Sequence, residues 1–110
     1  MNIKAIQKQL SNFADERDWD QFHNPKNLAM ALSVEASELV EIFQWLTPEQ
    51  AKAIMSSGEN EHVKEEIADI MIYLIRMADK LNVDLEKAVT DKIAKNAEKY
   101  PIKLAGKRQC

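Results

Sequence analysis

Two acidic pairs in this chain of 110 residues have a spacing that could bring carboxylates together: Glu35 with Glu38, and Glu66 with Asp69. Residues three positions apart share one face of a helix. Clustered carboxylates repel one another, and protons or bound cations relieve that repulsion. Ligand sets made only of oxygen suit Mg²⁺ or Mn²⁺, and carboxylate-bound Mg²⁺ keeps positions for phosphate oxygens and water. The pairs therefore point to phosphoryl chemistry.

Acidic pairs on helices are also common on solvated surfaces, so the position of each pair relative to the core matters. At 100° per residue, Glu35 lies about 20° from the centre of an apolar stripe, Glu38 about 80° and Glu41 about 140°. The stripe consists of Leu28, Leu32, Leu39, Ile42 and Leu46. The second pair flanks the apolar stripe of another long helix, which consists of Val63, Ile67, Ile70, Leu74, Met77 and Leu81. Histidine is absent from the matching positions, which disfavours a di-iron site. The residues alone leave a metal site and a solvated acidic face both open.

The elements that must position these pairs are helices. Only two glycines and three prolines interrupt the chain, which favours long helices. Capping signals at Asn24, Thr47 and Asp84 mark three helix starts, and Thr47 with Gln50 forms a capping-box pattern. We expect helices over residues 2–16, 26–46, 48–56, 60–81 and 85–99. The prediction is an all-α antiparallel, four-helix-bundle-like domain over residues 1–101, followed by a basic, mobile tail over 102–110.

Composition narrows the class of protein. A net charge of −3 and a pI near 5.4 argue against a nucleic-acid-binding protein. We expect no signal peptide and no membrane span, and the single cysteine, Cys110, fits a reducing cytoplasm. A short chain buries a limited core, which favours an oligomer. Candidate interface residues are the apolar side chains beside the stripes: Met30, Val34, Met71 and Ile75.

Three stretches that contain or follow the acidic pairs resemble a known family. They are "ERDWDQFHNPKNLAMALSVEASELVEIFQW" (16–45), "EEIADIMIYLIRMADKLNVDLEKAV" (65–89) and "KIAKNAEKYP" (92–101). They resemble the all-α nucleoside triphosphate pyrophosphohydrolases of the MazG type, closest to the dCTP pyrophosphatase branch. The resemblance implies Mg²⁺-dependent hydrolysis of a deoxynucleoside triphosphate to monophosphate and pyrophosphate, which would clean a nucleotide pool, with Mn²⁺ as a possible substitute.

The sequence leaves alternatives open for the preferred nucleotide base and for whether the chain is an enzyme. The first expectation is dCTP or a modified dCTP. Some relatives have a histidine near the base where this chain has Leu10, so dUTP, dATP or broad specificity remain open. A non-catalytic helical oligomer with an interaction or regulatory role is the alternative from another class.

The resemblance also implies a role for individual residues. The four metal ligands would be Glu35, Glu38, Glu66 and Asp69, and Glu35 or Glu38 would orient or deprotonate the attacking water. The phosphate-binding residues would be Lys92, Asn96 and Lys99, which could otherwise form a solvated basic helix end. The base-binding residues would be Trp19, His23, Trp45 and Tyr73, and the two tryptophans could instead be core or interface anchors. Relatives of this type form dimers or tetramers in which a neighbouring chain completes the pocket.

Overall fold

The computed structural model describes residues 1–102, and that part of the chain contains helices and no strand. The elements are α1 (Ile3–Glu16), η1 (Asp20–Phe22), α2 (Pro25–Phe43), α3 (Pro48–Lys52), η2 (Ile54–Ser56), α4 (Asn60–Lys80) and α5 (Leu85–Lys99). The prediction of an all-α fold is confirmed. The basic tail predicted over 102–110 lies outside the described residues, apart from Ile102. None of the helices described has the length and apolar character needed to cross a membrane.

Side-chain caps explain where the helices start. Asn24 accepts a hydrogen bond from the backbone N–H of Asn27 at 2.9 Å, directly before Pro25 at the start of α2. Thr47 and Gln50 form the predicted capping box. The ends are less well predicted. The second helix stops at Phe43 rather than at 46, and the third becomes a 3-10 turn after Lys52.

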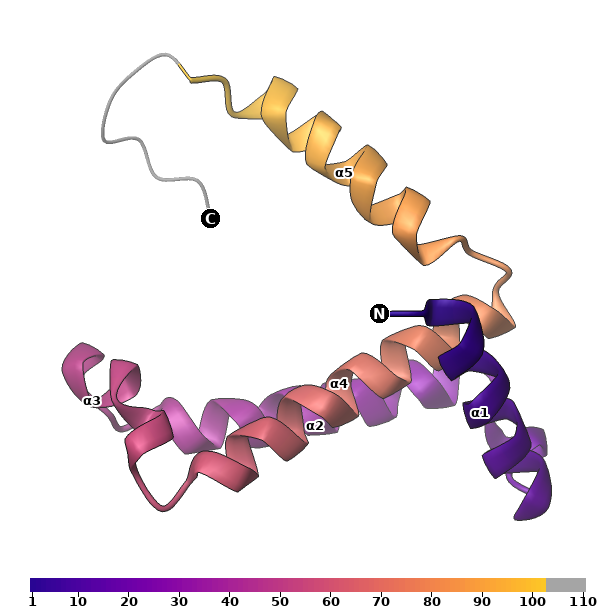
Figure 1. The fold of residues 1–110 in the computed structure, drawn as a ribbon, viewed down its shortest axis with the longest axis horizontal. Helices are drawn as coiled ribbons and strands as arrows, with labels where there is room; N and C mark the ends of the chain where they lie inside the picture. The colour runs from indigo at the N-terminus through magenta and orange to yellow at the C-terminus, as the bar shows by residue number, and fades with distance from the viewer. Residues whose placement is uncertain (103–110) are drawn as a thin grey trace.

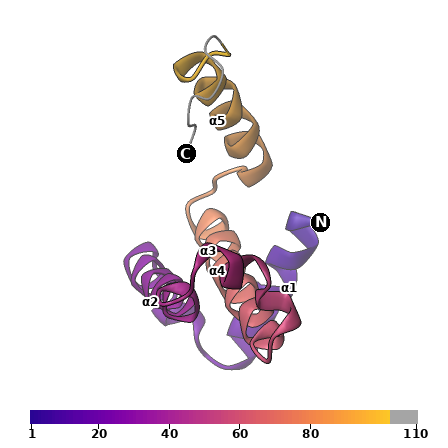
Figure 2. The same cartoon turned by 90° about the vertical axis from the view of Figure 1, so that its left-hand side faces the viewer.

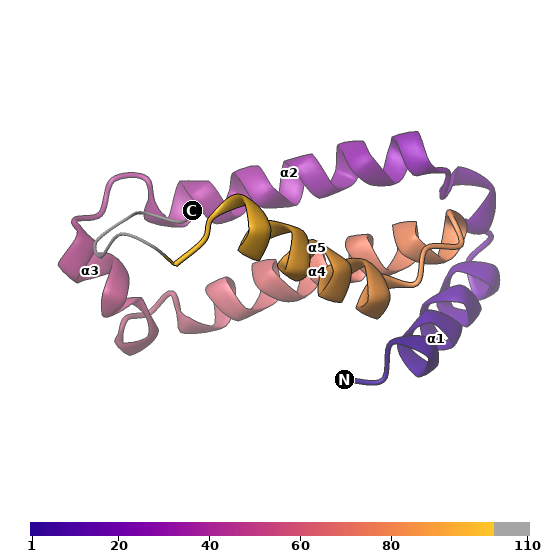
Figure 3. The same ribbon diagram turned by 90° about the horizontal axis from the view of Figure 1, so that it is seen from above.

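The centre of the molecule is the antiparallel pair of α2 and α4 (Figure 1; Figure 3). Helix α1 packs across α4 near one end of this pair. The buried apolar core is small and consists of Ala14, Leu28, Val63, Ile75 and Ala78. Ile75 is only 1% exposed, so its assignment to an interface between chains was wrong, because this side chain fills the core of its own chain.

Helix α5 leads away from the α2–α4 pair, as two perpendicular views show (Figure 1; Figure 2). Every residue of α5 after Leu85 is exposed. The described part of one chain is therefore a helical hairpin with α1 at one end, and it does not close into a four-helix bundle by itself.

Several apolar side chains of the central pair remain exposed. Ile67 and Leu74 belong to the predicted core stripe of α4, yet they are 54% and 38% exposed. Met30 and Val34 on α2, two of the predicted interface residues, are 59% and 58% exposed. Both central helices thus carry an apolar face that residues 1–102 of their own chain do not cover.

Candidate active site

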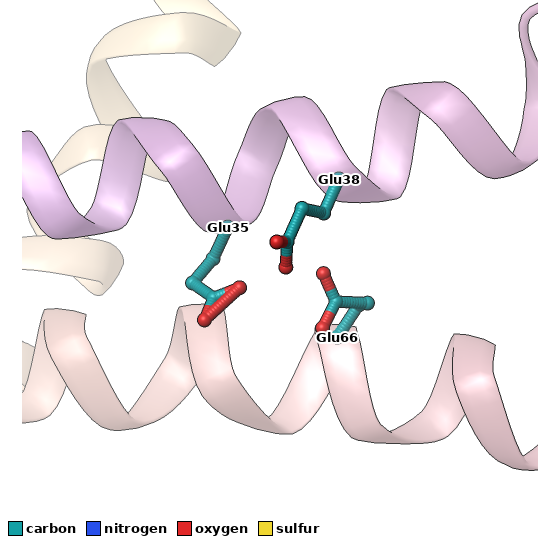
Figure 4. Close-up of side chains that lie close together, drawn as sticks. All are labelled: Glu35, Glu38 and Glu66. Atoms are coloured by element: carbon teal, nitrogen blue, oxygen red, sulfur yellow. The ribbon is translucent and has the colours of Figure 1, made fainter.

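Three of the predicted carboxylates meet between the two central helices. Glu35 and Glu38 project from α2 and Glu66 projects from α4 (Figure 4). One carboxylate oxygen from each residue lies within 4.8 Å of the others. Glu66 is only 5% exposed, Glu35 is half-buried and Glu38 is exposed. We call these three residues the carboxylate cluster.

Hydrogen bonding and burial perturb the acidity of the cluster. The pKa of Glu35 is raised to about 7, first by a hydrogen bond with Glu38, then by burial and by the charges of neighbouring carboxylates. The pKa of Glu66 is also raised, again first by a hydrogen bond with Glu38 and then by burial. The pKa of Glu38 is lowered because its carboxylate accepts hydrogen bonds from both neighbours. Without a cation, the cluster therefore retains protons that isolated carboxylates would lose.

Two oxygens of the cluster have no partner. Glu35 Oε2 and Glu66 Oε2 are buried and make no hydrogen bond within the part of the chain that the structure describes. A buried polar atom without a partner is unfavourable, and a cation bound by the cluster would give these carboxylates a partner. Hard divalent cations bind carboxylate oxygens. The residues present therefore fit a divalent metal ion.

A cavity of about 310 Å³ lies beside α4, lined by residues from α1, the segment around η1, and α4. Trp19, His23 and Tyr73, three of the predicted base-binding residues, all line it, and so does Leu10. Asp69 also lines this cavity and is not a member of the cluster. Asp69 follows Glu66 by one turn of α4, so the cavity adjoins the carboxylate cluster. The pKa of Tyr73 is raised by burial and then by the charges of Glu35 and Asp69.

The other predicted site residues lie elsewhere in the chain. Trp45 follows the end of α2, is 87% exposed and does not line the cavity. Lys92, Asn96 and Lys99 lie on α5 and are exposed. Because α5 leads away from the central pair (Figure 1), one chain does not bring these residues to the cluster.

Polar residues form a continuous stripe along α4 that sequence analysis recognised only in part. They recur at intervals of three and four positions, which places them on one side of the helix: Glu66, Asp69, Tyr73, Arg76 and Lys80. Arg76 is only 4% exposed and lines the cavity. Extending the spacing of the acidic pair towards the end of α4 would have identified it.

Arg76 holds the segment around η1 against α4. Its Nη2 donates to Asp20 Oδ1 at 2.6 Å, and Lys80 Nζ donates to the same oxygen at 2.6 Å. Arg76 Nε donates to His23 Nδ1 at 3.2 Å. The pKa of Asp20 is lowered, mainly by its hydrogen bond with Lys80. The pKa of His23 is lowered, first by burial and then by the charges of Arg76 and Lys80.

Comparisons with known proteins agree with this architecture. The dCTP pyrophosphatase 1 of Rattus norvegicus is 38% identical over 109 residues, which are 98% of this chain and 64% of that protein. The Homo sapiens dCTP pyrophosphatase 1 is 42% identical over 104 residues, 94% of this chain and 61% of that protein. The chain thus spans less than two thirds of the length of these curated relatives.

A solved structure and a family model extend the comparison. The crystal structure of a pyrophosphatase from Archaeoglobus fulgidus DSM 4304 is similar with a TM-score of 0.84 and 38% identity, covering 92% of this chain and 94% of that one. The model of the MazG-like family matches residues 30–109, which include the carboxylate cluster. The chain belongs to the MazG-like family.

Proposed function

We propose that this chain hydrolyses a deoxynucleoside triphosphate to the monophosphate and pyrophosphate, with dCTP or a modified dCTP as its first substrate. The observation that carries the proposal is the carboxylate cluster with two unpaired buried oxygens beside an aromatic cavity. The relatives named dCTP pyrophosphatase 1 support both the reaction and the base. Such an enzyme, one domain over residues 1–101, would clean a cytoplasmic nucleotide pool.

The cation in this proposal is Mg²⁺, held by Glu35, Glu38 and Glu66, with Asp69 one turn further along α4 as the fourth ligand. Bound there, it would neutralise charge on the triphosphate and make a coordinated water more acidic. Asp69 lines the cavity, so this ligand would join the metal site to the nucleotide pocket.

The chain's own carboxylates handle the proton of the attacking water. Glu38 has a lowered pKa and is ionised at neutral pH, so its free oxygen can accept that proton. Glu35, whose pKa of about 7 in the metal-free chain would fall once a cation is bound, would also be ionised there and is the other candidate base. The water oxygen bonds to the α-phosphorus, the bond to the bridging oxygen breaks, and pyrophosphate leaves with the bond electrons.

The cavity would hold the base. Trp19 and Tyr73 offer aromatic faces for stacking, and His23 offers a polar group at the cavity wall. The cavity adjoins the carboxylate cluster through Asp69, so a nucleotide can place its phosphates at the cluster and its base among the aromatic side chains.

A second copy of the chain would complete the site. Trp45 does not line the cavity of its own chain, and the predicted phosphate-binding residues lie on α5, away from the cluster (Figure 1), so in this proposal they act on the site of a neighbour. Apolar side chains on the central helices are available for that contact: Met30, Val34, Ile67 and Leu74. Two α2–α4 pairs packed on these faces would form the four-helix bundle of a homodimer, and two dimers a homotetramer.

A panel of nucleotides tests the proposal. The purified chain is incubated with each dNTP and Mg²⁺, and monophosphate, pyrophosphate and orthophosphate are measured separately. We expect monophosphate and pyrophosphate in equal amounts, fastest from dCTP or 5-methyl-dCTP. If no dNTP is turned over and none binds in the presence of metal, the non-catalytic oligomer becomes the better account. Orthophosphate as the first product would contradict attack at the α-phosphorus.

A further inference from the structure

The hydrogen bond between Arg76 and His23 determines which nitrogen of the imidazole carries a proton. A guanidinium group only donates hydrogen bonds, so His23 Nδ1 at 3.2 Å from Arg76 Nε must be the acceptor. In a neutral imidazole the other nitrogen then carries the hydrogen. Within residues 1–102, Nε2 makes no hydrogen bond and is not among the buried unpaired atoms. His23 thus keeps an accessible Nε2–H donor at the wall of the cavity.

Arg76 is itself rigidly held, so this orientation is well defined. It is 4% exposed, and its Nη2 bonds Asp20 Oδ1 at 2.6 Å while Nη1 lies 3.8 Å from Asp79. Both His23 and Asp20 belong to the segment between α1 and α2. One buried guanidinium therefore fixes the position of this segment and the tautomer of its histidine.

The order of residues along α4 indicates which part of a nucleotide meets His23. Glu66 marks the cluster, Asp69 and Tyr73 follow at the cavity, and Arg76 lies at its far end. Glu66 and Arg76 are ten residues apart, which is about 15 Å of helix. A nucleotide whose phosphates sit at the cluster would direct the base edge remote from the phosphates towards His23. In a pyrimidine, ring nitrogen N3 lies on that edge.

We propose that Arg76 is a positioning residue for base selection, which fixes His23 with Nε2–H as the donor. The pocket then favours a base whose N3 is unprotonated, as in cytosine, over one that carries a hydrogen there, as in uracil or thymine. The preference rests on the proposed function, because it concerns the base of the same substrate. Two N–H groups that face each other across the pocket repel, whereas Nε2–H and an unprotonated N3 form a hydrogen bond.

The test compares kcat/KM for dCTP and dUTP in Arg76→Met and Lys80→Met variants. Both substitutions remove a cation that bonds Asp20, but only the first removes the bond to His23. We expect the dCTP-to-dUTP ratio to fall about tenfold in Arg76→Met, the factor that one neutral hydrogen bond supplies, and to stay near the wild-type value in Lys80→Met. An unchanged ratio in Arg76→Met, or an equal loss in both variants, would overturn the proposal.

Nitrogen-15 NMR of the His23 ring gives a second readout. If Arg76 had only a structural role, its substitution would not change this readout. The wild-type spectrum should show a protonated Nε2 and an unprotonated Nδ1, with a mixture of tautomers in Arg76→Met. A wild-type Nδ1 that carries the proton would refute the inference. If Arg76→Met does not fold, His23→Gln, whose amide reaches the Nε2 position, should keep the dCTP preference, and His23→Asn should lose it. The opposite pattern would refute the inference.

Failure of the proposed function gives a different result. If the wild-type chain turns over no dNTP, the hydrolase proposal fails, whereas the tautomer and the relative binding of dCMP and dUMP can still be measured by NMR. Tighter binding of dCMP than dUMP, lost in Arg76→Met and kept in Lys80→Met, would support the role of Arg76 even then. Equal binding of the two monophosphates would overturn it.

Discussion

The affinity of the carboxylate cluster for Mg²⁺ should depend steeply on pH between 6 and 8, because Glu35 has a pKa of about 7. A carboxyl group with this pKa is about 9% ionised at pH 6 and about 91% ionised at pH 8. Only the ionised form binds a cation, so the Kd for Mg²⁺ should be about tenfold larger at pH 6. A carboxyl group at the ordinary value of 4.5 is already about 97% ionised at pH 6 and would give almost no change.

Isothermal titration calorimetry at the two pH values measures this dependence directly. Glu41→Gln is a matched control, because it removes an exposed carboxylate from the same helix and should leave the tenfold ratio intact. Glu35→Gln should weaken binding and flatten its pH dependence. If the wild-type chain binds Mg²⁺ with equal Kd values at pH 6 and pH 8, a proton on Glu35 does not compete with the cation, and the reasoning is refuted.

The raised pKa of Glu35 also determines how the stability of the metal-free chain changes with pH. A raised pKa means that the folded state holds the Glu35 proton more tightly than the unfolded state, so this contribution is complete below pH 4.5 and is lost as the pH rises through 7. Glu38 acts in the opposite direction, because its pKa is lowered. We expect Tm in a chelator to fall between pH 5 and pH 8, and excess Mg²⁺ to remove that fall. A Tm that rises over this range without metal would contradict the assignment.

Further changes test the rest of the account. Glu38→Gln should abolish turnover and lower Tm in the absence of metal at neutral pH, because it removes the ionised carboxylate that accepts hydrogen bonds from both neighbours; a raised Tm would mean that its charge repels the cluster. If a neighbouring chain supplies Trp45, the Trp45→Ala variant should be inactive by itself. Activity should return when it is mixed with inactive Glu38→Gln chains. Mixtures that stay inactive would place Trp45 in the site of its own chain. Val34→Lys should shift the sedimentation coefficient towards that of the monomer, and an unchanged coefficient would exclude this face from the interface. Asn24→Ala should destabilise the fold by about 1 kcal/mol in urea unfolding through loss of the cap, and no loss would show the cap to be dispensable.

Local signals in the sequence were sufficient for the starts of the helices and for all three residues of the carboxylate cluster, whereas Asp69, predicted with them, lines the adjoining cavity. Asn24 and Thr47 predicted helix starts correctly, because a cap depends on residues three positions away. Glu35 stood out because its position within an apolar stripe is visible from periodicity alone. Helix ends were harder to predict, since the turn after Lys52 has no comparably strong local signal.

Features that depend on distant residues were not predictable in the same way. Arg76 bonds Asp20, which is 56 positions away, and no local pattern reveals that contact. Helix α4 is apolar on more than one side, so periodicity could not decide that Ile75 would be buried and Ile67 exposed. The direction of α5 is likewise beyond local rules, because its apolar Val89 and Ile93 find no partner in the described part of the chain.

Hydrolysis in water enriched in oxygen-18 tests most directly the claim that the carboxylate cluster directs water to the α-phosphorus. The chain is incubated with dCTP and Mg²⁺ in the labelled water, and the products are separated and analysed by mass spectrometry. We expect one oxygen-18 atom in each dCMP and none in the pyrophosphate. Label in the pyrophosphate, or release of labelled orthophosphate with dCDP, would contradict it.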